Sequence, residues 1–117
     1  MMSGGTMYEQ RDIILIPFPY TDLSGMKLRP ALIVSNAMIN NTHDRVCCLI
    51  TSNPEKGKWK IHIDSVSQGT LPFKSWVKPH RVFTIHEGII KKRICQVSDN
   101  VHEKVVSSIQ SYIENFD

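Results

Sequence analysis

Apolar residues gather in short runs separated by turn residues over the first half of the chain. Residues 13–16 and 31–34 are aliphatic and β-branched runs; Pro17 and Pro19 close the first, and Pro30 opens the second. Residues 45–51 form a third run whose centre is continuously apolar. Runs of this length bounded by proline and other turn residues predict β-strands, and the unbroken centre of the third predicts burial on both faces.

The middle of the chain contains further extended segments. Residues 58–64 alternate between apolar and basic side chains, which predicts an amphipathic strand with a basic outer face: Trp59, Ile61 and Ile63 on one side, Lys58, Lys60 and His62 on the other. Residues 76–85 form an extended run in which Pro79 favours a bulge or an edge position. Residues 94–97 predict another short strand, whereas residues 37–44 and 68–72 are typical of a loop and a turn.

The hydrophobic period changes to a helical one near the C-terminus. Val101, Val105 and Ile109 recur at helical spacing, and Asn100 with Glu103 forms a capping-box pattern. We therefore expect one terminal helix of about four turns. Many short strands and a single helix predict a mainly β, small barrel, since closure removes strand edges in a domain of this size.

The length of 117 residues predicts a single domain spanning residues 1–117, and neither an internal repeat nor a Pro-, Ser- or Gly-rich linker divides it. The longest apolar stretch, residues 13–18, is far shorter than the roughly 20 residues needed to cross a bilayer. The first residues lack the apolar segment of a signal peptide. We therefore expect a cytoplasmic protein without a membrane span.

The chain has three cysteines, of which Cys47 and Cys48 are adjacent. An odd number cannot form a closed set of disulfides, which fits a reducing compartment. Neighbours on a strand point to opposite faces, so Cys47 and Cys48 are not expected to bind one metal ion. We expect buried thiols, no metal site and no cofactor.

The net charge of +3 is unevenly distributed. Residues 1–53 have a net charge of 0, residues 54–95 of +6, and residues 96–117 of −3. A basic segment in an otherwise balanced chain indicates either a surface that faces a polyanion or simply a solvated face. The same two readings apply to Arg29, which precedes Pro30 at the mouth of a strand: its guanidinium can pair with a local carboxylate or bind phosphate with its planar fork.

Three segments together resemble the PemK/MazF family of toxin–antitoxin ribonucleases. They are residues 12–36, which contain the Arg29-Pro30 pair; residues 49–54, which contain Thr51-Ser52; and residues 75–85. The resemblance covers nearly the whole chain. It implies an SH3-like barrel of the CcdB/MazF type, a homodimer, metal-independent cleavage of single-stranded RNA, and a cognate antitoxin whose disordered tail occupies the RNA groove.

The resemblance also implies roles for individual residues. Arg29 matches the catalytic arginine of the family and Thr51 its catalytic threonine, with Ser52 beside it. Attack by the 2′-hydroxyl of the RNA needs a base, an acid and positive charge on the phosphorane, and arginine suits the last role. The loop from Tyr20 to Leu28 borders the site in this family, so Tyr20, Thr21 and Lys27 are expected to contact RNA.

Other candidates have two alternative roles each, or extend the RNA contacts. His80 occupies the position where some members carry an acidic residue, so it is either an acid or base or a histidine bonded to backbone. Three lysines of the basic segment are expected to contact RNA: Lys58, Lys60 and Lys78. Trp59 and Trp76 either stack on bases or pack in the core. Some members also have Gly-Asp where this chain has Arg11-Asp12, which affects the local turn.

Two rival functions belong to different classes. Related barrels poison DNA gyrase by protein contact, and a chain with this fold can also be a catalytically inactive nucleic-acid-binding module. Arg29 and Thr51 favour the ribonuclease, because protein contact does not require a pair of residues that binds phosphate.

Overall fold

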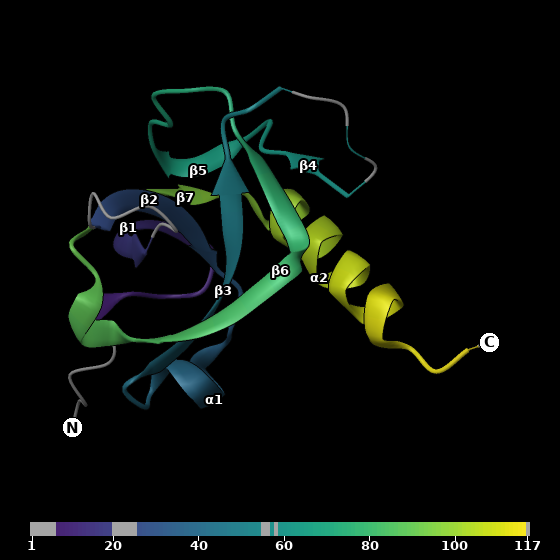
Figure 1. Ribbon diagram of the computed structural model, residues 1–117, viewed down its shortest axis with the longest axis horizontal. Coiled ribbons are helices and arrows are strands. Elements are labelled where there is room, and N and C mark those ends of the chain that lie inside the picture. The colour runs from purple at the N-terminus through teal and green to yellow at the C-terminus, as the bar shows by residue number, and fades with distance from the viewer. Residues whose placement is uncertain (1–6, 20–25, 55–56, 58, 117) are drawn as a thin grey trace.

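The computed structural model describes residues 7–19, 26–54, 57 and 59–116. Within these residues, seven strands form one antiparallel sheet in the order β4-β6-β3-β2-β1-β7-β5. The strands are β1 (Asp12–Pro19), β2 (Met26–Ile33), β3 (Asp44–Thr51), β4 (Ile61–His62), β5 (Val66–Gly69), β6 (Trp76–His86) and β7 (Lys92–Val97). The sheet curls into a half-barrel, and helix α2 (Asp99–Ile113) lies against it (Figure 1). The expected mainly β fold with a C-terminal helix is confirmed.

The curled sheet buries apolar side chains on both faces. On one face Leu32, Cys48 and Val77 pack with Val101 and Val105 of α2. On the other face Ile14, Ile16, Ala31, Ile33 and Cys47 form a second cluster. Adjacent residues alternate between the two clusters, as a strand that is buried on both sides requires.

The cysteines follow the same alternation. Cys47 and Cys48 belong to different clusters, and Cys95 is also buried. Burial raises the pKa of both the Cys47 and the Cys48 thiol to about 12. The prediction that Cys47 and Cys48 are buried is confirmed, and all three cysteines are free thiols. Among the described residues, no group of three or more His, Cys, Asp or Glu side chains is arranged to hold a metal ion.

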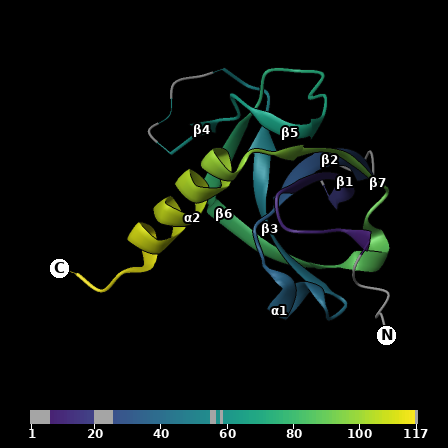
Figure 2. The ribbon, with the colours of Figure 1, turned by 180° about the vertical axis from the view of Figure 1, so that it is seen from behind.

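Helix α2 contacts β6 and β4 along its first turns, and its C-terminal end extends beyond the sheet (Figures 1 and 2). Its N-cap is Ser98, whose side chain accepts a hydrogen bond from the Val101 amide. The prediction of Asn100 as the cap is therefore wrong by two residues, because Ser98 is also a good capping residue and lies where β7 ends. No helix in the described part of the chain is long and apolar enough to cross a membrane.

Two segments differ from the sequence prediction. Residues 37–44 were expected to form a loop, but Ala37–Asn40 form the one-turn helix α1, capped by the Asn36 side chain. Residues 68–72 were expected to form a turn, but Gln68 and Gly69 belong to β5 and pair with β7. The amphipathic strand predicted over residues 58–64 is shorter, since only Ile61–His62 pair with β6.

Arg11 adopts a left-handed backbone conformation, with φ of 80°. Such a conformation costs about 1–3 kcal/mol for a residue other than glycine. This cost explains why the glycine that some PemK/MazF proteins have in place of Arg11 suits the turn. The side chain compensates by bonding across to β7: Nη1 donates to the Val97 carbonyl at 3.1 Å and Nη2 to Gln96 Oε1 at 3.2 Å. The Arg11-Asp12 pair thus keeps the turn through side-chain contacts.

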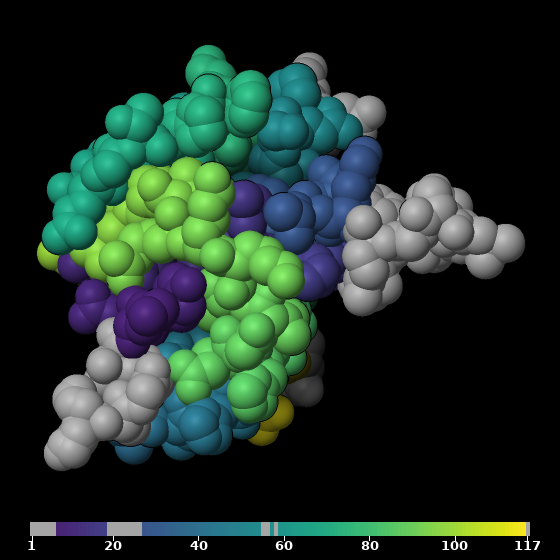
Figure 3. All heavy atoms as spheres, turned by 90° about the vertical axis from the view of Figure 1, so that its left-hand side faces the viewer, coloured from purple at the N-terminus to yellow at the C-terminus, as the bar shows by residue number. Residues whose placement is uncertain are grey.

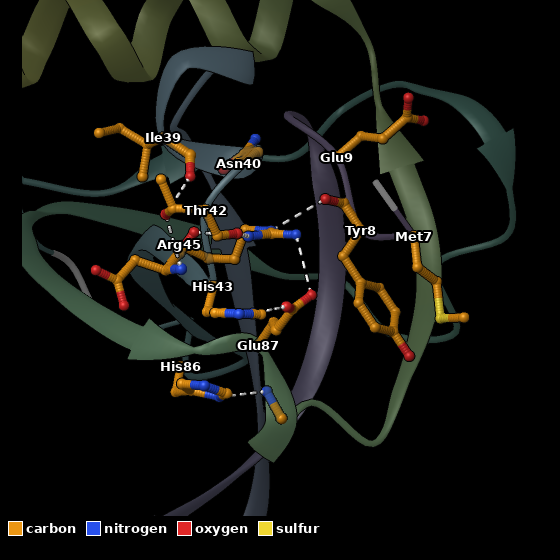
Figure 4. A network of polar contacts seen from close by, with 12 residues as sticks. Met7, Tyr8, Glu9, Ile39, Asn40, Thr42, His43, Arg45, His86 and Glu87 are labelled. Atoms are coloured by element: carbon orange, nitrogen blue, oxygen red, sulfur yellow. Dashed lines mark hydrogen bonds and ion pairs between the residues drawn. The ribbon is translucent and has the colours of Figure 1, made fainter. Parts of the chain in front are cut away.

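A buried arginine anchors the start of β3 (Figure 4). The Arg45 side chain is 0% exposed. Its guanidinium donates to backbone carbonyls, including those of Thr42 (2.8 Å) and Asp44 (2.7 Å), and Nη2 lies 3.4 Å from Glu87 Oε1. The other Glu87 oxygen bonds to His43 Nδ1 at 2.6 Å. This network joins β3 to the 3₁₀ turn Glu87–Ile89 that follows β6.

Candidate nucleic-acid interface

The end of β3 opens a gap in the sheet. Strands β2 and β3 pair at Ala31–Leu49, Leu32–Cys48 and Ile33–Cys47. Both strands continue beyond Ala31 and Leu49, but there β2 remains paired only with β1, and β3 only with β6. The ladder thus ends beside Pro30, which has no N–H to donate.

Arg29 and Thr51 lie on either side of this gap. Continuing the register of β2 and β3 by two residues would set Arg29 opposite Thr51. Arg29 is held in β2 by its pairing with Ile16 of β1, and Thr51 in β3 by its pairing with Trp76 of β6. Figure 3 shows the start of β2, in blue, at the surface beside the residues that follow β3, in teal. The two strands therefore place the two predicted catalytic residues on opposite sides of the gap.

A shallow hollow of about 200 Å³ lies on the β4–β6 side of Thr51. Its described lining comes from the end of β3, the segment before β4, and β6: Thr51, Asn53, Gly57, Trp59, Lys60, Lys78 and His80. This lining contains two lysines, a histidine and no carboxylate. Its chemistry suits an anion.

A bulge in β6 directs two of these residues into the hollow. Leu49 of β3 pairs with Lys78, but the preceding Cys48 pairs with Val82, so three extra residues are inserted in β6. The buried Pro79 begins this insertion. Bulges often redirect side chains next to functional sites. Here Lys78 and His80 both line the hollow, and neither side chain forms a hydrogen bond or ion pair with another residue in the described ranges.

The floor of the hollow is held by the turn after β3. The Asn53 amide donates to Thr51 Oγ1 at 3.1 Å, and Lys60 Nζ donates to the Asn53 carbonyl at 3.0 Å. Because the threonine oxygen accepts this bond, its own hydrogen can still be donated to a ligand. Lys60 Nζ also lies 5.2 Å from the ring centroid of Trp76, within cation–π distance. These contacts fix Thr51 and Lys60 relative to each other.

The structure thus brings together four predicted site residues, Thr51, Lys60, Lys78 and His80. Ser52 is exposed next to Thr51, and Lys27 is exposed on β2 near Arg29; neither belongs to the lining of the hollow. Three further candidates, Tyr20, Thr21 and Lys58, lie outside the described residues.

The basic segment is not one continuous surface. Lys60 and Lys78 line the hollow, whereas Arg93 lies on β7 and forms an ion pair with the buried Asp12 at 2.8 Å. The Arg93 charge is therefore used within the fold. The distribution of charge along the sequence does not show that these basic residues lie on different parts of the surface. They do so because β6 and β7 are not neighbours in the sheet.

Sequence reasoning missed Asn53, and it left the role of Trp59 open. Trp59 is 51% exposed, which rules out the core position for this residue. Trp76 is partly buried, with the His62 ring 5.5 Å away in addition to the Lys60 ammonium. A signal for Trp59 was present: it stands between Lys58 and Lys60, and interleaved basic and aromatic residues are typical of single-strand binding surfaces.

Comparison with known proteins gives the family. Residues 9–113 match the family model of the PemK-like, MazF-like toxin of type II toxin–antitoxin systems. The chain belongs to the PemK/MazF toxin family. No curated protein sequence matches it significantly.

Solved structures of this family share the fold. MazF (Form-I) from Deinococcus radiodurans has a TM-score of 0.73 and 16% identity, covering 91% of this chain and 96% of that one. The MazE–MazF (Form-II) structure from the same organism has a TM-score of 0.72 and 16% identity, covering 93% and 97%. The Mycobacterium tuberculosis toxin MazF-mt6 has a TM-score of 0.70 and 18% identity, covering 91% and 100%. These structures confirm the expected architecture, and the match to the family model confirms the expected family.

Proposed function

We propose that this PemK/MazF-family protein is an endoribonuclease toxin that cleaves single-stranded RNA through attack of the 2′-hydroxyl on the adjacent phosphate. The observation that carries the proposal is the hollow in which Thr51, Lys78 and His80 meet beside the gap between β2 and β3, with two lysines and no carboxylate among the described residues that line it. The reaction uses a nucleophile that belongs to the RNA, so it requires neither a cofactor nor a metal-activated water.

Each residue has a role that follows from its chemistry. Arg29 stabilises the negative charge that develops on the phosphorane, since its planar guanidinium binds two phosphate oxygens at once. Thr51 donates its hydroxyl hydrogen to a third oxygen, and Ser52 assists in positioning the phosphate. His80 transfers a proton, either from the 2′-hydroxyl or to the departing 5′ oxygen. Lys60 and Lys78 attract the flanking phosphates.

The proposed partners follow from the family. One relative is described as an endoribonuclease in complex with its cognate antitoxin from a mycobacterial species, and another as MazE–MazF. We extend this to the present chain: a cognate antitoxin with a disordered tail occupies the RNA groove, and the toxin acts as a cytoplasmic homodimer. Tyr20, Thr21, Lys27 and Lys58 extend the RNA contacts.

The test is cleavage of a long unstructured RNA in EDTA, with the ends of the fragments mapped. Fragments should end in a 2′,3′-cyclic phosphate and a 5′-hydroxyl, the products of 2′-hydroxyl attack. Arg29→Ala and Thr51→Ala should each lower the cleavage rate about 100-fold to 1000-fold, the usual cost of losing one charge-stabilising donor. Lys91→Ala, on the exposed surface before β7, is the matched control and should cleave normally.

Two results would contradict the proposal. Full cleavage by a folded Arg29→Ala protein would refute the mechanism. RNA binding without cleavage by the parent protein would favour an inactive nucleic-acid-binding module, and absence of both would favour action by protein contact.

A further inference from the structure

Trp59 is a large aromatic residue held at the surface of the hollow. Its side chain is 51% exposed, yet it is a lining residue together with Thr51 and His80. Exposure of a single apolar side chain is common, but Trp59 combines it with a place in the lining of a hollow that also contains two lysines and a histidine.

The indole ring of Trp59 packs against the end of α2. The ring of Tyr112, near the end of α2, lies 5.4 Å from the Trp59 ring at 84°, an edge-to-face arrangement. The His80 ring lies 6.4 Å away on the other element, β6. Edge-to-face aromatic pairs stabilise a fixed ring orientation. The end of α2 thus braces Trp59 next to the proposed proton-transfer residue.

The size of the hollow limits what it can hold. Pockets for small molecules usually have volumes of about 300–1,000 Å³ and enclose most of the ligand. This hollow has about 200 Å³ and is open to the surface. It therefore suits one unit of a polymer that passes over the surface, with an anionic group near Lys60 and Lys78 and a flat apolar group against the indole.

We propose that Trp59 is a stacking platform for one unpaired base of single-stranded RNA, next to the phosphate that reacts at Thr51 and His80. This inference rests on the proposed function and adds a positioning residue to it. Every base has a π-face, so a single indole binds without strong preference for sequence. Stacking of this base fixes the position of the RNA strand on the protein surface, and so holds the neighbouring phosphate at the site of reaction.

Binding is tested with a 2′-fluoro RNA of eight nucleotides and mixed sequence, which has no 2′-hydroxyl and cannot be cleaved. The chain has two tryptophans, so in a Trp76→Phe protein the fluorescence reports on Trp59 alone. The probe should quench this fluorescence in a saturable manner. An abasic oligonucleotide of the same length and charge should bind more weakly and should not quench.

Affinity separates stacking from other roles. Trp59→Ala should weaken binding of the 2′-fluoro probe about 5-fold to 150-fold, which corresponds to stacking of one base. Trp59→Phe should restore most of the loss, and the dependence on salt should stay as in the parent because no charge is changed. Phe73→Ala is the matched control: Phe73 is 72% exposed but lies outside the hollow, so affinity should not change.

Three results would overturn the inference: equal affinity of the parent and Trp59→Ala, a loss that Trp59→Phe does not restore, or equal quenching by the abasic probe. Cleavage is measured separately on ordinary RNA. If the protein cleaves RNA and Trp59→Ala leaves KM unchanged, the inference fails and the proposed function stands. If Trp59 binds the base as expected but the RNA is not cleaved, the inference stands and the nuclease function fails.

Discussion

Replacing Glu87 by glutamine should destabilise the fold, because it removes the negative charge that faces the buried Arg45 guanidinium. The glutamine keeps the shape and an oxygen acceptor, so the change is mainly one of charge. Arg45 retains its backbone carbonyl partners at Thr42 and Asp44, which satisfy hydrogen bonds but do not neutralise it. Figure 4 shows Glu87 between Arg45 and His43.

The two contacts of Glu87 contribute different amounts to the free energy of unfolding. The His43 side chain is 75% exposed, and exposed ion pairs contribute about 0–1 kcal/mol. The Arg45 side chain is 0% exposed and Glu87 is 15% exposed, so this contact belongs with hydrogen bonds to charged groups, which contribute about 1.5–3 kcal/mol. Its length of 3.4 Å favours the lower end. The expected loss in free energy of unfolding is about 2 kcal/mol.

The effect should depend on pH. The hydrogen bond from His43 lowers the pKa of the Glu87 carboxyl, burial opposes this, and the positive charges of Arg45, His43 and His86 lower it further. A carboxylate whose folded pKa lies below its unfolded value contributes stability above the unfolded value, and the contribution is lost as the pH falls through the folded value. The difference between parent and Glu87→Gln should therefore be largest above about pH 5 and shrink below about pH 4.

Thermal unfolding followed by circular dichroism measures the effect. For a chain of this length, about 2 kcal/mol corresponds to a decrease in Tm of about 8 °C at pH 7. Glu103→Gln, an exposed carboxylate on α2, is the matched control and should leave Tm nearly unchanged. A Glu87→Gln protein that melts with the parent at pH 7, or whose Tm difference is the same at pH 3.5, would refute the reasoning.

Two further predictions concern the interface. The double variant Lys60→Gln, Lys78→Gln should reduce the slope of log affinity against log salt concentration for single-stranded RNA by about 1.4, at about 0.7 per neutralised phosphate. The control variant Lys91→Gln, Lys92→Gln, outside the hollow, should leave the slope unchanged. Equal slopes for the parent and the Lys60, Lys78 variant would mean that these two lysines are only solvated. If His80 transfers a proton, the cleavage rate should depend on pH, rising with pH if His80 acts as a base and falling if it acts as an acid. His80→Ala should lose this limb and about 100-fold in rate; an unchanged rate and profile would make His80 structural.

The central strands could be predicted from sequence because their burial is unambiguous. Residues 45–51 are apolar on both faces, and the structure places Cys47 and Cys48 in separate clusters. The break at Pro79 correctly indicated a bulge, and Pro79 also lies beyond the two residues of β6, Trp76 and Val77, that pair with β4.

The edge strand β5 could not be predicted, because pairing over long distances in sequence determines it. Val66–Gly69 contain a serine, a glutamine and a glycine, which favour a turn locally, but β7 supplies their partners. Tertiary contact thus outweighs local propensity. The helix start shows the converse problem: Ser98, Asp99 and Asn100 are all good capping residues, and only the end of β7 selects Ser98.

The candidate site depends on the order of strands in the sheet. Thr51, Lys60 and His80 are far apart in sequence, and they meet because β6 lies between β3 and β4. The resemblance to PemK/MazF proteins indicated Arg29 and Thr51, but neither it nor the periodicity indicated that the β2–β3 ladder ends at Ala31 and Leu49. Pro30 accounts for this end in physical terms, since a residue without an N–H cannot continue the ladder. The Arg29-Pro30 pair therefore combines two features: the proline ends the ladder, and the arginine beside it carries the charge that our proposed mechanism assigns to phosphate binding.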